Sequence, residues 1–373
     1  MKKIILLSII FSCVCMGYAQ KRIVGNKNIV TKTQILAPFS VFRGGCSAEI
    51  RIIKSVENKA IVSIDENLIE YYHLEVINDE LKLYKFPEVN CTHTQFTITI
   101  YTPHIKELDL SGSGNKSVSG FSEKNFALKQ QGSGNLVMEN IIATNDFTFH
   151  HTGSGSALLT NTTGTNFALE HSGSGNLAME NIIATNDLTL HHTGSGSVLL
   201  TNTTSTNFAL EHSGSGNTDL ADIIIKNDLT TKFTGSGSLK IRNYDIHNLT
   251  IDKSGSGDIH ISNPDYSKYM DKLMIDHQSS GNISITNLLA NKTNIKIHSS
   301  GNINLSGKTT EIIMNSNSTG NINARDLEAQ IAHIENASVG DVQLTVTKKA
   351  YISDKGAIGK IKIFGEGEVS YTE

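Results

Sequence analysis

Regularly spaced histidines are the residues of this chain whose type and position point first to chemistry. His151, His171, His192 and His212 each stand two residues before a Gly-Ser-Gly triplet. If the segments that carry them stack in register, neighbouring imidazoles lie about 5 Å apart, close enough to share a metal ion or to repel each other when protonated. Phe233 occupies the equivalent position further along the chain, which favours neutral core histidines bonded to turn backbone over a metal site.

A polar segment with two tyrosines is the second candidate site. Residues 263–272 read NPDYSKYMDK and fall where the spacing between turn glycines is longest. Because tyrosine offers a large amphipathic contact area, we expect binding through Tyr266 and Tyr269, with Asp265 and Lys268 beside them. The alternative is a tolerated insertion whose tyrosines fold back over the apolar strands.

The cysteines allow two interpretations. Cys46 and Cys91 are the only cysteines beyond residue 19, and an even pair in an exported chain is typical of one disulfide. Two buried free thiols are the alternative. A metal site on this pair is disfavoured, because His93 is the only histidine at a suitable spacing.

The chain shows no cluster typical of catalysis, and we predict neither a catalytic residue nor a cofactor. A polysaccharide lyase or hydrolase would need Asp, Arg or Lys gathered in one local cluster that occurs once in the chain. The middle of this chain consists of near copies and contains no Trp to stack on sugar rings. We therefore predict a binding or structural module, with a polysaccharide-processing enzyme as the alternative. Only Asp258 and Asp341 follow a turn glycine, so structural calcium is not predicted.

These residues must be positioned by a repeat. A block of 41 residues that starts at Asn125 is followed at once by a copy that starts at Asn166, with 33 of the 41 letters unchanged. Each block holds two Gly-Ser-Gly triplets, so the glycines recur every 20 or 21 residues from Gly114 to Gly257 and continue, less regularly, to Gly340. Such a period is typical of a solenoid, in which each coil, or rung, buries its apolar face against its neighbours.

Apolar residues alternate within each unit, as at Ile259 and Ile261. Alternation predicts strands with one buried face, two or three to a rung, and glycine at the corner is attributed to its free access to positive φ. Asparagines at the other corners are expected to bond to one another along the coil axis. Two such rows are Asn140, Asn161, Asn181 and Asn202, and Asn145, Asn166, Asn186 and Asn207.

The amino terminus has the pattern of an export signal. Residues 1–19 combine two lysines, an apolar core too short for a membrane span, and small residues before a predicted cleavage at Gln20. The bulky Phe11 disfavours lipid attachment at Cys13. Cleavage would leave 30 basic and 36 acidic residues, a net charge of −6, which disfavours nucleic acid and anionic membranes as partners.

The regions on either side of the repeat are expected to close the solenoid. We predict an N-terminal cap with irregular first rungs over residues 20–107, regular rungs over 108–345, and final rungs with a cap over 346–373. An open end would expose unpaired backbone groups and core side chains. Strands are predicted over residues 49–54, 60–65, 72–77, 81–86 and 95–101.

The segment TITIYTPHIKELDLSGSGN and the later rungs written GNIS, GNIN and GDVQ resemble the head GIN domain family of auto-transporter adhesins from Bacteroidetes-type bacteria. The motif GNIN stands at residues 301–304 and again at 320–323. The resemblance implies a single-stranded, right-handed parallel β-helix and an adhesin-like role at the cell surface or in the periplasm, toward a surface glycan or protein. It transfers no catalytic residue, and the near-verbatim duplication departs from the family pattern.

Overall fold

The computed structural model describes residues 21–87, 89–265, 267–298 and 300–372. The predicted export signal, with Cys13 and the cleavage site at Gln20, lies outside these ranges, and so does Tyr266.

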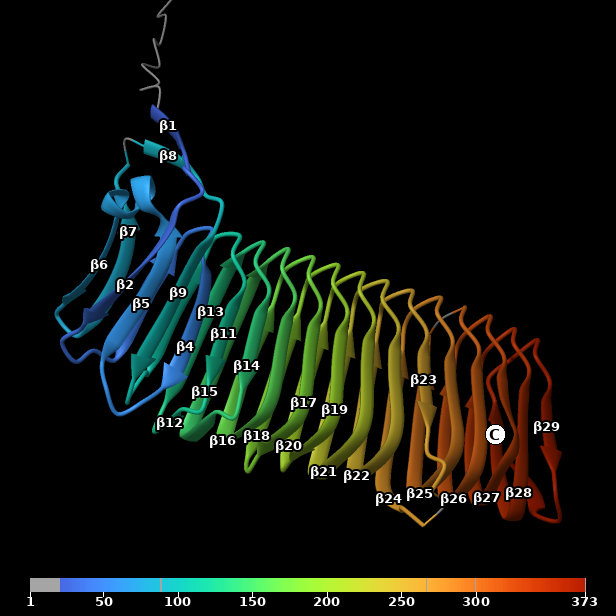
Figure 1. Ribbon diagram of the computed structural model, residues 1–373. Helices are drawn as coiled ribbons and strands as arrows, with labels where there is room; N and C mark the ends of the chain where they lie inside the picture. The colour runs from blue at the N-terminus through green and yellow to red at the C-terminus, as the bar shows by residue number, and fades with distance from the viewer. Residues whose placement is uncertain (1–20, 88, 266, 299, 373) are drawn as a thin grey trace, which may run out of the picture.

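The chain forms a long β-solenoid of about 13 turns with roughly 20 residues in each, so the predicted all-β fold is confirmed. Figure 1 shows the rungs stacked side by side along one axis, with the N-terminal segments at one end. From residue 107 onward every strand pairing is parallel. The strands of this part are β10 (Glu107–Ser111), β11 (Lys116–Ser119), β12 (Ser122–Glu123), β13 (Phe126–Gly132), β14 (Leu136–Glu139), β15 (Ile142–Gly153), β16 (Ala157–His171), β17 (Leu177–Ala184), β18 (Asp187–His192), β19 (Val198–Ser205), β20 (Asn207–His212), β21 (Thr218–Phe233), β22 (Leu239–Lys253), β23 (Ile259–Ser262), β24 (Met270–His277), β25 (Ile283–Ile297), β26 (Ile303–Ser316), β27 (Ile322–Asn336), β28 (Val342–Asp354), β29 (Ile361–Phe364) and β30 (Glu368–Thr372).

Each rung contains three extended segments separated by three corners. In the rung that begins after Gly175, the buried side chains come from every second position of each segment, for example Leu177, Ile182 and Leu190. Because the registers are continuous, equivalent residues stack along the axis, as Leu177 does on Val198. The result is one apolar core along the whole rod.

The asparagine corner carries the positive backbone angle. Asn140, Asn161, Asn181 and Asn202 have φ between 50° and 58°, a conformation that asparagine adopts more readily than most residues. Their side chains also bond from rung to rung: Asn181 Nδ2 donates to Asn161 Oδ1 at 2.9 Å. In the second predicted row Asn186 Nδ2 donates to Asn166 Oδ1 at 2.9 Å, but Asn166 and Asn207 donate to Asp146 and Asp187. This corner therefore alternates asparagine with aspartate, which differs from the predicted row of asparagines.

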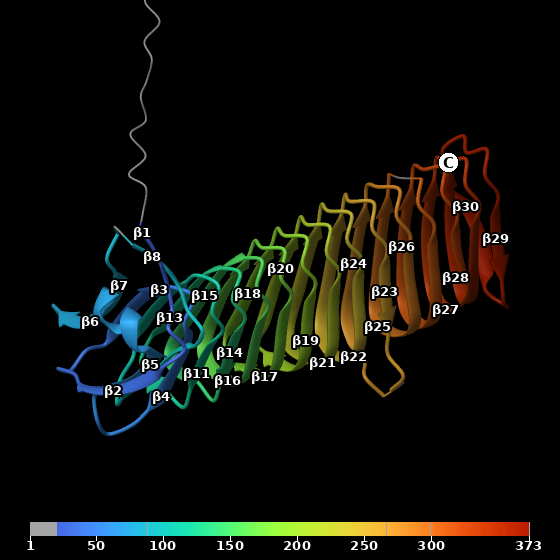
Figure 2. The same ribbon diagram turned by 45° about the horizontal axis from the view of Figure 1, so that its top comes forward.

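The N-terminal segments pair out of sequence order. Strand β3 lies between β10 and β7, and β4 lies between β11 and β9, so the first rung in the sequence is the second in space. Antiparallel strands β5, β2 and β6 then pair outside β9 and β7 (Figure 2). The elements are β1 (Lys21–Val24), β2 (Ile29–Ile35), β3 (Val41–Gly45), β4 (Glu49–Lys54), β5 (Lys59–Asp65), the 3-10 helix η1 (Glu66–Tyr71), β6 (Tyr72–Ile77), β7 (Glu80–Lys85), β8 (Val89–Thr92) and β9 (Phe96–Thr102).

Candidate functional site

The stacked Gly-Ser-Gly corners form one edge of the rod, which we call the glycine edge. A methyl group on Gly175 would lie 1.9 Å from the carbonyl oxygen of Gly155, and one on Gly173 would lie 1.9 Å from that of Gly153. Only glycine lets consecutive corners approach this closely. The explanation by positive φ was wrong for most triplets: only Gly112 and Gly132 among their glycines adopt it.

Polar side chains project from the glycine edge in regular rows. The serine between the two glycines is exposed in every triplet, and the row consists of Ser113, Ser133, Ser154, Ser174, Ser195, Ser215, Ser236 and Ser256. A second row follows the last glycine, and its side-chain oxygens accept the backbone N–H of the next rung. Thus Ser197 N donates to Asn176 Oδ1 at 2.9 Å, and Asn302 N donates to Asn282 Oδ1 at 2.9 Å. This ladder explains why asparagine recurs directly after the turn glycine.

The glycine edge is hollowed in its C-terminal third. A shallow depression of about 440 Å³ is lined by His298, Ser300, Asn317, Ser318, Thr319, Ala337 and Val339. Hydroxyl, amide and imidazole groups dominate this lining, and it contains no carboxylate.

The four predicted histidines lie inside the rod, beneath the glycine edge. His151, His171, His192 and His212 are at most 1% exposed, and successive ring centroids are 5.0, 5.0 and 4.6 Å apart. His212 Nε2 lies 3.1 Å from the Gly214 carbonyl oxygen, as expected for a core histidine bonded to the turn. Both ring nitrogens of His151 and His171 lack a hydrogen-bond partner within the described structure.

Burial keeps these imidazoles neutral. It lowers the pKa of His151 to about 4, with a smaller contribution from His171, and that of His192 to about 4, with help from His212. The Gly155 carbonyl opposes the shift at His151, although no hydrogen bond of good geometry joins the two. No group of three His, Cys, Asp or Glu side chains in the described residues could hold a metal ion.

Cationic residues continue the same interior row. Lys253 is 1% exposed, and its Nζ donates to the Gly255 carbonyl at 2.5 Å and to Ser279 Oγ at 2.9 Å. Burial lowers the pKa of Lys253 to about 8 and, together with the Lys253 charge, that of His277 to about 4. Lys116 is buried outside this row, on β11 after the turn, where it stacks on Leu136 and its Nζ donates to the Gly112 carbonyl at 3.0 Å. We did not single out His277 or Lys116 from the sequence, although their spacing from the turn glycines was visible there.

Cys46 and Cys91 are half-buried free thiols. The structure therefore shows the second interpretation, free thiols, and not the disulfide. The Ala48 N–H donates to Cys46 Sγ at 3.4 Å, and burial raises the pKa of the Cys46 thiol. Tyr72 lies between this region and His93, whose Nε2 is 2.5 Å from the phenol oxygen. Burial, followed by the neighbouring Cys91, raises the pKa of the Tyr72 phenol.

The predicted contact loop leaves the rod between β23 and β24, and it projects clearly in Figures 1 and 2. Tyr269 is 51% exposed. Lys268 Nζ forms an ion pair with Asp245 Oδ2 at 2.9 Å, and Asp265 Oδ1 accepts the Ser267 N–H at 2.9 Å. The structure therefore joins Lys268 to the wall of the rod and leaves Tyr269 toward solvent.

One wall of the rod carries a continuous column of charged residues, which sequence analysis missed. It lies on the outer side of the strands that lead into the glycine edge, and we call this wall the charged face. Strand registers stack Lys82, Arg43, Asp109, Lys129, His150, Glu170, His191, Glu211, Lys232, Asp252, Asp276, Lys296, Asn315, Glu335 and Ser353 in this order. Neighbours along the column pair: His150 Nδ1 lies 2.5 Å from Glu170 Oε2, and His191 Nδ1 lies 3.0 Å from Glu211 Oε2.

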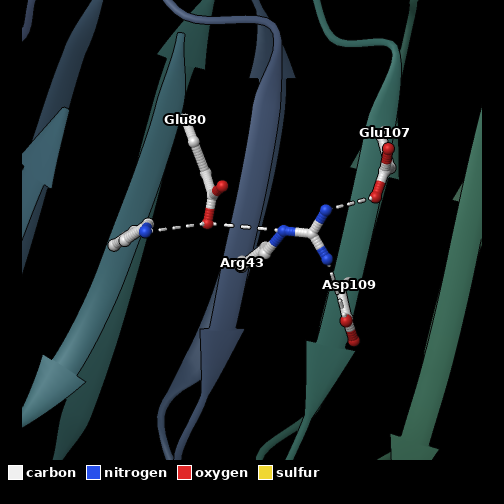
Figure 3. Close-up of polar contacts among 5 residues, drawn as sticks. Arg43, Glu80, Glu107 and Asp109 are labelled. Atoms are coloured by element: carbon white, nitrogen blue, oxygen red, sulfur yellow. Dashed lines mark hydrogen bonds and ion pairs between the residues drawn. The ribbon is translucent and has the colours of Figure 1, made fainter. Parts of the chain in front are cut away.

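The column begins in a cluster around Arg43 (Figure 3). The Arg43 guanidinium on β3 contacts Glu80 on β7 at 3.3 Å, and Glu107 and Asp109 on β10 at 2.8 and 3.5 Å. The cluster therefore ties together the three strands that pair out of sequence order. It also brings carboxylates and basic groups, including Lys82, around one shallow hollow, the arrangement that a polysaccharide-processing enzyme would need.

Within the described ranges, no helix has the length and apolar character needed to cross a membrane.

Comparison with known proteins identifies the family. Residues 39–222, 168–268 and 265–367 match the family described as "Putative auto-transporter adhesin, head GIN domain". No curated protein matches the chain. Among solved structures, the chain is similar to a "putative adhesin" from Bacteroides fragilis, with 17% identity, coverage of 64% of this chain and 99% of the other, and a TM-score of 0.49.

Two structures from Parabacteroides distasonis are also similar. A "putative lipid binding protein" has 17% identity and a TM-score of 0.33, covering 95% of this chain and 100% of its own. A "putative adhesin" has 15% identity and a TM-score of 0.31, covering 94% and 100%. Since the family matches span the described solenoid from the first rungs to the last, the chain belongs to the head GIN domain family of auto-transporter adhesins.

Proposed function

We propose that the chain is an exported, adhesin-like binding module whose glycine edge recognises an uncharged surface glycan. The observation that carries this proposal is the set of exposed hydroxyl and amide rows, repeated from rung to rung. Rung spacing of about 4.8 Å gives a ladder of donors and acceptors along which an extended polymer can repeat its contacts. Membership of an adhesin family supports an exported location, and the signal cleaved before Gln20 would deliver it.

The glycine edge suits a neutral ligand better than the charged face does. Its middle row consists of serine, and the described residues that line the hollow in its C-terminal third are mostly polar and include no carboxylate. Hydroxyl and amide groups can both donate and accept, as sugar hydroxyls do. A surface protein is the other kind of partner that this edge could bind. An array that carries both glycans and surface proteins distinguishes the two.

The test is a glycan and surface-protein array probed with the mature chain, followed by variants. Glutamate at Ser154, Ser195 and Ser236 should weaken binding to the identified glycan by about tenfold or more, because three carboxylates would disrupt the row. The matched control places glutamate at Ile142, Ile183 and Ile224, which are exposed on another wall with the same spacing. Binding that survives the serine changes, or falls equally in the control, would exclude the glycine edge as the contact surface.

A polysaccharide-processing enzyme is the second candidate, and the cluster around Arg43 is the observation that favours it. However, Arg43 lies within ion-pair distance of Glu80, Glu107 and Asp109, so each carboxylate already has a partner. Incubation of the mature chain with the glycan it binds should release no new reducing or unsaturated ends. Release that disappears in the Asp109→Asn variant would establish the enzyme instead.

A further inference from the structure

The sequence of charges along the charged face is complementary to the same sequence in reverse order. Over the five rungs on either side of a centre between His191 and Glu211, each Lys or His on one side corresponds to an Asp or Glu at the same number of rungs on the other side, while Arg43, one rung further out, corresponds to Asn315. The five central pairs are His191 with Glu211, Glu170 with Lys232, His150 with Asp252, Lys129 with Asp276, and Asp109 with Lys296.

A twofold axis turns this pattern into contacts between two copies. An axis that lies in the plane of the charged face, parallel to its strands, would place the column of one copy over the reversed column of the other. Three central pairs then place a lysine opposite a carboxylate across the contact, and the other two place His191 and His150 opposite Glu211 and Asp252, which stabilises the dimer and specifies its register. A shift of one rung in either direction would oppose Asp109 to Asp276, or Lys129 to Lys296, so the arrangement selects one register.

A second outward-facing column lies two residues before the charged one on each strand, and its side chains are compatible with the same twofold contact. It is small over the middle rungs, where Ala168, Thr189 and Ala209 stack, so the two faces can approach closely. Nearer the ends, the half-exposed apolar residues Val41 and Ile313 would oppose each other.

We propose that the charged face is a dimer interface between two antiparallel copies of this chain. Ten rungs at about 4.8 Å, each with about 20 Å of strand, offer roughly 900 Å² on each partner, close to the 800 Å² of a standard interface. Because the axis runs along the strands, both glycine edges lie on the same side of the dimer. The dimer would therefore present two parallel ladders toward one surface, which raises avidity without new contacts.

Charge reversal tests the interface directly, by sedimentation equilibrium of the mature chain at low salt. Lys129→Glu and Asp276→Lys should each weaken dimerisation by about tenfold or more, since each places like charges opposite one another twice in the dimer. The double variant Lys129→Glu with Asp276→Lys restores opposite charges and should recover most of the affinity. Lys240→Glu, an exposed change on another wall, should leave dimerisation unchanged.

Deletions provide a second test that follows from the same symmetry. Removal of residues 166–206 takes out Glu170 and His191 together, and the remaining column is still complementary, so the shorter chain should dimerise. Removal of residues 166–186 takes out Glu170 alone and places His191 opposite Lys232, so this chain should dimerise more weakly. A monomeric wild type, or a double reversal that does not recover, would overturn the proposal. Glycan binding by a monomer would leave the proposed function standing while this inference failed.

Discussion

Glycine at the corner of each rung is required by space. Successive corners bring the backbone of one rung against the carbonyl oxygen of the previous one, as at Gly175 and Gly155. The residue in the left-handed conformation is the asparagine at the opposite corner, for example Asn181 with φ 58°. Two residue types thus solve two different problems in one coil: close approach at one corner and a reversed backbone angle at another.

Substitution of Gly175 by Ala should therefore be destabilising. The added methyl group would meet the Gly155 backbone at 1.9 Å, and neither rung can move without disturbing its neighbours. We expect a loss of about 3 kcal/mol, at the upper end for an overpacked core, measured by urea denaturation. Ser174→Ala is the matched control at the adjacent exposed position and should change stability by less than about 0.5 kcal/mol. Equal stability of the two variants would contradict the packing explanation.

The buried histidines should make the solenoid sensitive to acid. Burial lowers the folded pKa of His151 and His192 to about 4 from an ordinary 6.5, so the unfolded chain binds more protons between these values. Stability should be complete above about pH 6.5 and fall as the pH drops toward 4, by about 3 kcal/mol for each such histidine. The urea midpoint measured between pH 7 and pH 4.5 checks this prediction.

The control for acid sensitivity replaces His151 and His192 with leucine, the residue that occupies the equivalent position at Leu110. Surface carboxylates keep their own pH dependence in this variant, but the histidine contribution is removed. Its urea midpoint should fall less than that of the wild type over the same range. An identical fall in both chains would show that the interior row does not titrate on unfolding.

At the scale of elements, the loop between β23 and β24 departs from the regular coil. Asn263 is buried and its Nδ2 donates to the Tyr244 carbonyl at 3.0 Å, which fixes the point where the chain leaves the wall. The described part of the loop then extends into solvent, with Tyr269 about half exposed. Tyr269 is therefore not packed over the rungs, and binding through it stays a prediction.

Tyr269→Ser should accordingly lower partner binding with little change in melting temperature. An exposed side chain away from caps and cores contributes less than about 0.5 kcal/mol to stability. Tyr244→Ser is the control at a buried tyrosine, 5% exposed, and should cost about 3 kcal/mol. If Tyr269→Ser lowers the melting temperature as much as Tyr244→Ser while the folded fraction still binds, Tyr269 is a packing residue.

At the scale of the whole molecule, the stability and length of the rod increase rung by rung. Each rung contacts only the rungs beside it, and the ladder of bonds at every corner repeats without interruption across the duplicated block. Length can therefore change in steps of one rung while the cap and the last rung stay as they are. The alternation of Asn and Asp at one corner, seen at Asn166 and Asp187, repeats only every second rung.

Deletion of residues 166–206 should leave a folded rod that is shorter by two rungs, or about 10 Å. Asn207 would follow Thr165 as Asn166 does now, so the corner bonds reform with the same partners in kind. Small-angle scattering measures the length, and a single urea transition establishes that the chain still folds as one unit. Loss of cooperative unfolding would contradict the modular description.

The sequence by itself determined the solenoid, its period and the inward position of the histidines. All of these follow from local spacing, because a repeat of 20 residues stacks each residue on its own copy. The five strands expected between residues 49 and 101 are present, since alternation alone defines them. The same logic could have found Lys116 and His277, which stand at fixed distances from turn glycines.

Tertiary structure decided what depends on contact between rungs. Strand β3 lies between β7 and β10 because pairing, and not sequence order, places the first rungs, and only this order gathers Glu80, Arg43 and Asp109. From Asp109 to Glu335 the charged column stands three residues before each turn triplet, so spacing could have revealed it, but the placement of Arg43 and Lys82 at its end depends on the out-of-order pairing of β3 and β7. The reason for glycine was also hidden, because the clash it avoids is with the rung below rather than with its own chain neighbours.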